Sequence, residues 1–152
     1  MPFVCLLLVF GMAIPNPLSI ASRNDEAFDP GHPGIVGVTL HPVLWAAALW
    51  AFAHAMPNGD LAHVLLFGLF GVFSFMLMLA IDIRKQRILG VTDWRRLSRR
   101  TSLVPFAGLV GGRWRPSFHK INLVRLVAAI GLYVGFLALH QPVIGVSPFL
   151  PL

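Results

Sequence analysis

Histidines are the side chains of this sequence best suited to chemistry. There are six among 152 residues, and three of them, His54, His63 and His140, lie within or beside long apolar runs. An ionisable side chain in an apolar membrane segment is costly and usually faces a partner inside the protein. Neutral imidazole is also a common ligand of metals and haem iron. These three histidines are therefore candidate cofactor ligands, with a hydrogen-bonded structural role as the alternative for His54.

His41 and His54 stand at the two ends of one predicted helix. Thirteen residues separate them, which corresponds to about 20 Å along a helix, so they cannot bind the same metal ion. His41 precedes Pro42, and proline is typical of a first helical turn. We expect His41 to cap this helix or to contact lipid headgroups. His54 is therefore the candidate cofactor ligand on this helix.

Several kinds of active site are disfavoured by what the sequence lacks. The single cysteine, Cys5, excludes an internal disulfide, a CxxC redox pair and a thiolate zinc site. Asp60 follows a Pro-Asn-Gly turn and is best placed to cap the next helix. No other carboxylate accompanies the histidines, so a zinc hydrolase is not expected. The chain has no GxSxG, Walker, GxGxxG or HExxH motif.

The elements that position the histidines are predicted to be membrane helices. The chain is 57% hydrophobic and 12% charged, whereas an average soluble domain carries about twice that share of charge. We predict one all-α domain over residues 1–152, a polytopic transmembrane helix bundle with segments at 2–20, 40–56, 61–81 and 121–140. The second and third segments should form a tight hairpin. Because the apolar run at 3–14 is too short to span a bilayer, we expect the sequence to begin partway through a membrane helix.

Positive charge is concentrated in one region. The net charge is +6, and eleven of the twelve Lys and Arg residues lie between Arg84 and Arg125. A basic block can indicate nucleic-acid binding, but no binding module accompanies this one. The positive-inside rule instead predicts a cytoplasmic loop at 82–120 and no nucleic-acid partner. This orientation places His54, His63 and His140 toward the opposite side of the membrane. Within the loop, residues 92–102 are predicted to form an interfacial helix whose arginines lie among lipid phosphates.

Three stretches of the chain together resemble the NnrU family. They are LHPVLWAAALWAFAHAMPNGDLAHVLLFGLF, the basic DIRKQRILG followed by RRTSLVPFAG, and the C-terminal LYVGFLALHQPVIGVSP. The resemblance extends over about residues 3–150. It implies a polytopic protein of the bacterial inner membrane, associated with nitric oxide and nitrite reduction. The family is similar to the 15-cis-zeta-carotene isomerases, membrane enzymes that use haem b.

The resemblance also implies a cofactor site. In the isomerases, the histidine of a W-x-x-A-H motif is an axial haem ligand, and His54 occupies that position here. A cysteine implicated in ligand exchange precedes it by three residues, where this chain has Ala51. The other axial histidine of the isomerases lies on an N-terminal helix, and from the resemblance we expect that helix to be missing from this sequence. A second ligand would come from His63, His140 or another chain, or would be absent.

Three functions follow as hypotheses. The first is a haem-b-associated membrane factor that supports nitrogen-oxide respiration, with His54 as the iron ligand. The second is a haem-dependent carotene cis-trans isomerase, against which Ala51 counts. The third is a non-catalytic accessory subunit of a membrane complex, or a homo-oligomer, for which Gly131 and Gly135 form a GxxxG packing motif. The lipid bilayer is the partner that all three share.

Overall fold

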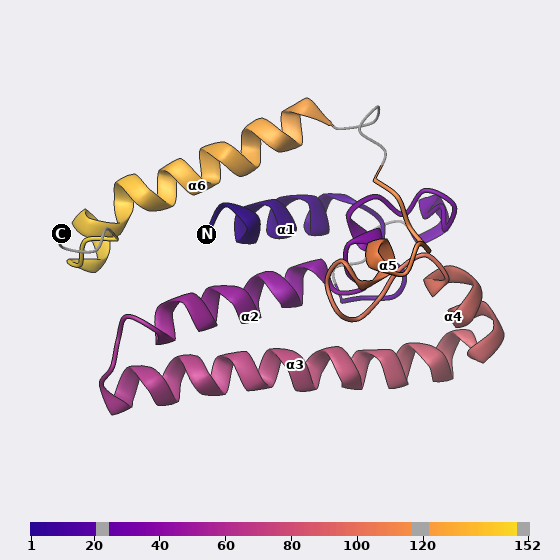
Figure 1. Cartoon of the computed structure of the whole chain (residues 1–152), viewed down its shortest axis with the longest axis horizontal. Helices are drawn as coiled ribbons and strands as arrows, with labels where there is room; N and C mark the ends of the chain where they lie inside the picture. Colours follow the sequence, from indigo (N-terminus) through magenta and orange to yellow (C-terminus); the bar gives the residue numbers. More distant parts are fainter. Residues whose placement is uncertain (21–24, 117–121, 149–152) are drawn as a thin grey trace.

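The computed structural model describes residues 1–20, 25–116 and 122–148, and within these ranges every regular element is a helix (Figure 1). The all-α prediction is therefore confirmed. The α-helices are α1 (Pro2–Ala13), α2 (Pro42–Ala55), α3 (Leu61–Leu89), α4 (Val91–Ser98), α5 (Ala107–Val110) and α6 (Leu123–Ile144). Two short 3-10 turns, η1 (Asp25–Ala27) and η2 (Gly34–Gly37), lie in the connection between α1 and α2.

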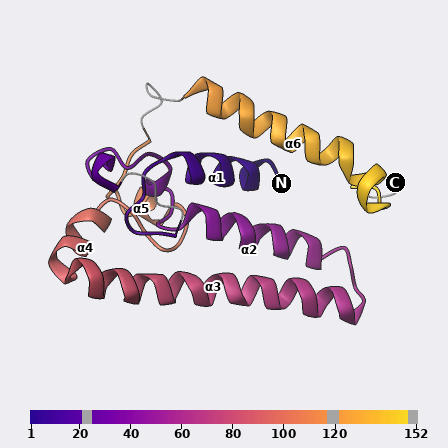
Figure 2. The same ribbon diagram turned by 180° about the vertical axis from the view of Figure 1, so that it is seen from behind.

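The predicted hairpin is formed by α2 and α3, which lie antiparallel along each other (Figures 1 and 2). Pro42 occupies the first turn of α2, and Asp60 caps α3 by accepting a hydrogen bond from the backbone N–H of His63 at 3.1 Å. Leu44 and Ala48 of α2 pack against Met78 and Ile81 of α3. The local start and stop signals of the sequence thus correctly predict this pair of helices.

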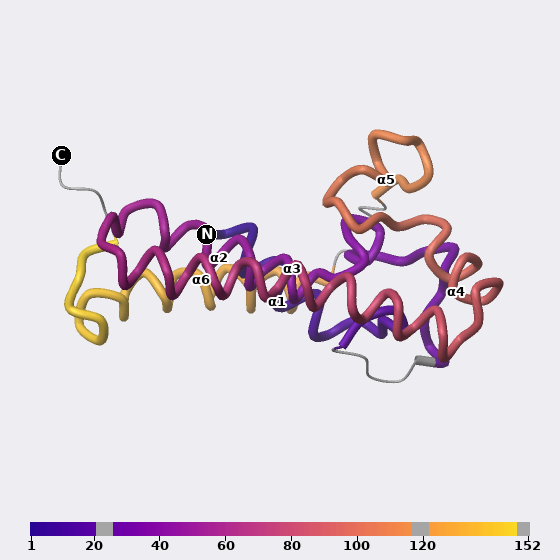
Figure 3. Tube along the Cα trace, turned by 90° about the horizontal axis from the view of Figure 1, so that it is seen from below, coloured from indigo at the N-terminus to yellow at the C-terminus, as the bar shows by residue number. Residues whose placement is uncertain are grey.

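The four long helices form one layer in the order α3, α2, α1, α6 (Figures 1 and 2). Gly11 permits the close approach of α1 to α2, because a Cβ atom there would lie 2.8 Å from Cβ of Pro42. Seen edge-on in Figure 3, the layer is thin, and the connecting segments gather at one end of it. This loop end carries α4 and α5, while the turn between α2 and α3 lies at the other end.

Two helices, α3 and α6, are long and apolar enough to cross a membrane. Only 17% of the apolar window of α3 and 6% of that of α6 is buried, so both present most of their apolar side chains outward. The helices α1 and α2 are shorter than a span. Four membrane segments, as predicted, are therefore not confirmed.

Several helices have bounds that differ from those of the predicted membrane segments. The first segment, expected over 2–20, is helical only to Ala13, and Asn16 and Ser19 beyond it are buried. The third segment does not end at Ile81 but continues to Leu89, because basic residues are favourable near a helix C-terminus and no helix breaker occurs before Gly90, whose φ is 78°. The last helix likewise extends to Ile144, beyond the predicted end at residue 140.

The region expected to be one basic loop, 82–120, is largely ordered structure packed onto the α1–α2 connection. Leu40 N–H donates to Ser102 O at 2.8 Å, and Phe106 N–H donates to Val38 O at 2.8 Å. Part of the range 92–102, predicted to be helical, forms α4, which begins after Gly90 and ends at Ser98. Residues 117–121, which include the end of the predicted loop and the first residue of the last predicted segment, lie outside the described ranges.

Candidate functional site

The three candidate ligands lie at the same end of the helical layer, opposite the loop end. His54 stands in the last turn of α2, His63 in the first turn of α3, and His140 in the C-terminal part of α6. Figure 1 shows these three helix ends together. The imidazole rings of His54 and His140 have centroids 6.3 Å apart and planes inclined by 30°. The structure therefore brings these two residues together, although 86 positions separate them.

His54 has a defined tautomer. Its Nδ1 lies 2.8 Å from the carbonyl oxygen of Trp50, one helical turn earlier. A carbonyl oxygen can only accept, so Nδ1 carries the proton and Nε2 is the basic nitrogen. Among the described residues, no hydrogen-bond partner is recorded for Nε2. Histidines that bind a metal usually donate their other N–H to such an oxygen, which fixes the ring and the tautomer.

His140 has the same arrangement. Its Nδ1 lies 2.7 Å from the carbonyl oxygen of Val146. The chain turns at Gly145, the C-cap of α6, which adopts the left-handed conformation with φ 83°. This turn brings the Val146 carbonyl group close to His140. The Nδ1 proton is again fixed, and Nε2 is available as a lone-pair donor.

His63 is positioned differently. Its Nδ1 bonds the carboxylate of Asp60, and both side chains are at least half exposed. The backbone bond from His63, followed by the side-chain bond, lowers the pKa of Asp60 below its ordinary value. The His63 ring contacts Phe67, which in turn lies beside the His54 ring. Among the described residues, the Phe67 ring therefore stands between His63 and the His54 ring.

Aromatic rings surround His54. The Trp50 ring lies 4.6 Å from it and the Phe67 ring 5.3 Å, measured between centroids. Trp50 also packs edge-on against Phe67 and Phe70. Such a wall is apolar and offers flat faces to a planar ligand.

The donor set at this end suits some cofactors and not others. Within the described ranges there is no group of three or more His, Cys, Asp or Glu residues that could hold a metal ion. A zinc site with three protein ligands is therefore not formed by these residues. Haem iron needs only one or two axial imidazoles, and His54 and His140 each present a fixed Nδ1 proton and an available Nε2. In donor chemistry, these two histidines are compatible with haem iron.

A second histidine site was not predicted. His41 is completely buried. Its Nε2 lies 3.0 Å from Oδ1 of Asp82, and its Nδ1 lies 2.9 Å from the hydroxyl oxygen of Ser19. It makes no side-chain cap bond, and its burial excludes contact with lipid headgroups. His41 thus occupies the N-cap position of α2 as expected, but the expected contact of its side chain with the helix end or with headgroups is wrong. The one signal in the sequence for the partner of His41 was the position of Asp82, an isolated acid directly after the apolar run at 61–81.

The His41 network joins the α1–α2 connection, α2 and α3 at one buried point. A Ser-His-Asp chain can activate a serine nucleophile, but Ser19 is only 3% exposed, so no substrate reaches its hydroxyl. The network acts as an anchor that fixes the start of α2 against α3. Asn16 reinforces it by donating from Nδ2 to Leu40 O at 2.9 Å.

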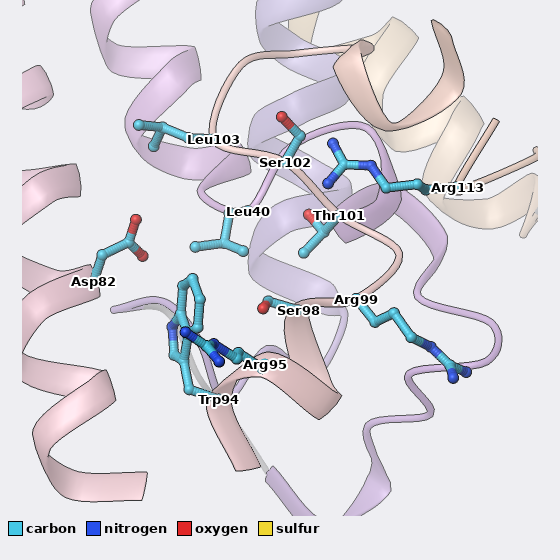
Figure 4. A pocket seen from close by; sticks show the side chains of 10 residues that line it. All are labelled: Leu40, Asp82, Trp94, Arg95, Ser98, Arg99, Thr101, Ser102, Leu103 and Arg113. Atoms are coloured by element: carbon cyan, nitrogen blue, oxygen red, sulfur yellow. The ribbon is translucent and has the colours of Figure 1, made fainter. Parts of the chain in front are cut away.

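Asp82 also faces a cleft of about 310 Å³ between α3, α4 and residues 101–103 (Figure 4). Arg95, Arg99 and Arg113 line it with Trp94. The indole N–H of Trp94 is buried, and among the described residues it has no hydrogen-bond partner. The cleft thus combines three cationic side chains with one carboxylate.

The fold and the site define an all-helical protein with two candidate membrane-spanning helices and a pair of histidines at one end. The family model of the NnrU protein matches residues 1–148. The chain therefore belongs to the NnrU family, as the sequence motifs predict. No curated protein and no solved structure matches it.

Proposed function

We propose that this chain is a haem-b-associated integral membrane protein of the bacterial inner membrane that supports nitric oxide or nitrite reduction. The observation that carries the haem assignment is the geometry of His54. Its Nδ1 proton is held by Trp50 O at 2.8 Å, which leaves Nε2 as the basic nitrogen in an aromatic setting. The link to nitrogen-oxide reduction rests on membership of the NnrU family.

The membrane location is supported by α3 and α6. Both are long, apolar and mostly exposed, and outward apolar surface of this extent is favourable only against lipid. The basic loop end is proposed to lie in the cytoplasm, following the positive-inside rule. The histidine end then lies toward the opposite face.

His54 is the proposed ligand of the haem iron, and His140 is the better supported second ligand because its ring already lies beside that of His54. Bound haem supplies an iron centre that can exchange electrons and bind a diatomic such as nitric oxide. Trp50 orients His54 through its carbonyl group. The rings of Trp50 and Phe67 lie against the imidazole and provide an apolar setting on that side.

The test is an absorption spectrum of the purified, detergent-solubilised protein titrated with haem. A Soret band shifted from that of free haem is expected for the wild type, and it should be lost or strongly altered in His54→Ala. The matched control is His32→Ala, because His32 is an exposed histidine in the loop that follows α1. A shifted band that is equally strong in His54→Ala, or no band in the wild type, contradicts the ligand assignment.

The variant His140→Ala distinguishes a haem iron bound by one histidine from an iron bound by two. If His140 is the second ligand, its loss should convert a six-coordinate spectrum into a five-coordinate one while haem remains bound. The isomerase alternative gains no support, because Ala51 is fully buried and carries no thiol. If no haem binds, an accessory subunit becomes the better hypothesis, since Gly131 and Gly135 have no atom within 4 Å of an added Cβ and leave that face of α6 open.

A further inference from the structure

A second cleft, of about 660 Å³, lies where the end of α1, residues 31–38 and the start of α6 meet. Four arginines line it: Arg100, Arg113, Arg115 and Arg125. These residues come from three separate parts of the chain, so the cluster exists only in the folded protein. Four arginines gathered in one concave site indicate a role other than keeping the protein soluble.

Among the side chains that the structure describes, no Asp or Glu lines the cleft to balance these arginines. In the part of the chain that the structure describes, the one arginine–carboxylate ion pair is Arg96 with Asp93, on α4. Asp29, close to the cleft in sequence, is already bonded to the His32 side chain and to Gly31 N–H. Uncompensated cations in a concave site attract an anion.

The cleft is partly fixed in advance. Arg100 donates from Nη1 to Gly31 O at 2.6 Å, so its guanidinium is already held toward the cleft. Trp114 lies so close to Gly37 that an added Cβ would overlap the indole ring. Arg125 is only half-buried, and it stands in the first turn of α6, whose N-cap is Asn122. A site whose donors are held by packing binds an anion with a smaller ordering cost.

Part of the cleft lining is apolar. Phe10 and Ile14, at the end of α1, line it together with Trp114. From there the outward surfaces of α1 and α6 run side by side away from the loop end (Figures 1 and 2). A ligand that contacts both the arginines and the apolar residues would have an anionic headgroup and a hydrocarbon tail.

We propose that this cleft binds the headgroup phosphate of an anionic phospholipid, with an acyl chain lying along α1 and α6. Arginine suits phosphate because its guanidinium can donate two parallel hydrogen bonds. The neighbouring cleft shares Arg113 but contains Asp82, whose charge opposes an anion. The proposal relies on the membrane location proposed above but not on haem, since the cleft and His54 lie at opposite ends of α2, about 20 Å apart along the helix.

The experiment is a lipid titration of the full chain in detergent, without added haem, followed by native mass spectrometry. Phosphatidylglycerol is compared with phosphatidylcholine, for the wild type and for the double variant Arg113→Gln/Arg125→Gln. The matched control is Arg84→Gln/Arg87→Gln, which removes the same charge from exposed positions on α3 outside the cleft. Each arginine near an anionic headgroup contributes about fivefold to binding, so the cleft variant, which lacks two, should bind phosphatidylglycerol about 25-fold more weakly.

A second measurement probes the cleft by tryptophan fluorescence and does not require removal of its arginines. Phosphatidylglycerol brominated near its headgroup should quench part of the wild-type tryptophan fluorescence, and Trp114→Phe should lose that part. Equal binding of the two lipids, equal losses in both double variants, or quenching unaffected by Trp114→Phe would overturn the proposal. So would displacement of the lipid by an equal concentration of inorganic phosphate, because that result would identify a site for free anions. Failure of haem binding leaves each of these outcomes unchanged.

Discussion

Replacement of His41 by alanine should destabilise the protein more than any other single histidine substitution. The imidazole is fully buried and bonded on both nitrogens, to Asp82 at 3.0 Å and to Ser19 at 2.9 Å. Its removal leaves the Asp82 carboxylate, only 15% exposed, and a buried hydroxyl without a partner. Leaving a buried polar group without its hydrogen-bond partner costs about 1–3 kcal/mol, and more where that group is charged. Because water still reaches part of Asp82, we expect the loss to be about 3 kcal/mol.

The measurement is the free energy of unfolding in mixed micelles of a mild detergent and dodecyl sulfate, followed by circular dichroism. His32→Ala is the matched control, because His32 also bonds an aspartate, but both side chains are more than 60% exposed. Its loss should be far smaller, since both groups keep their contact with water. Asp82→Asn preserves an acceptor oxygen for His41 and should fall between the two. If His41→Ala costs no more than His32→Ala, the buried network does not anchor α2 against α3.

Three further outcomes are expected. Gly37→Ala should destabilise the loop end by about 1–3 kcal/mol in the same unfolding assay, because an added Cβ would overlap the Trp114 indole; a neutral result would contradict that packing. Gly11→Val should weaken the contact of α1 with α2, where even a Cβ is too close, and cross-linking of cysteines placed on the two helices should decrease. The pKa of Asp60 is lowered by its bonds from His63, so the α3 cap should persist above the ordinary aspartate pKa and be lost only as the pH falls through the lowered value. Hydrogen exchange at the His63 amide should report the loss of the cap. The control Asp60→Asn should show no such pH dependence, because asparagine caps without titrating. Fraying of α3 at the ordinary aspartate pKa would refute the prediction.

Local features of the sequence were sufficient for the helical class and for much of the architecture. A long uncharged apolar run predicts α3, and Pro42, the Pro-Asn-Gly turn and Asp60 predict the α2–α3 hairpin. Each of these signals acts within a few residues through backbone conformation or capping, so it can be recognised without the fold. Helix ends were less certain, because charged residues such as Arg84 and Lys85 are compatible with both a helix end and a loop. The structure continues α3 through them to Gly90.

The sequence by itself also determined that His54, His63 and His140 would lie toward one end, because helix direction follows from the order of segments and the placement of charge. Only the tertiary structure decided that His54 and His140 are neighbours and that His63 is separated from them by Phe67. The role of His41 was likewise decided by packing, since its partners Ser19 and Asp82 are 22 and 41 residues away. The arginine cleft, too, is assembled from distant segments. Contacts of this kind depend on how helix faces and connections meet in space, and no local propensity encodes that arrangement.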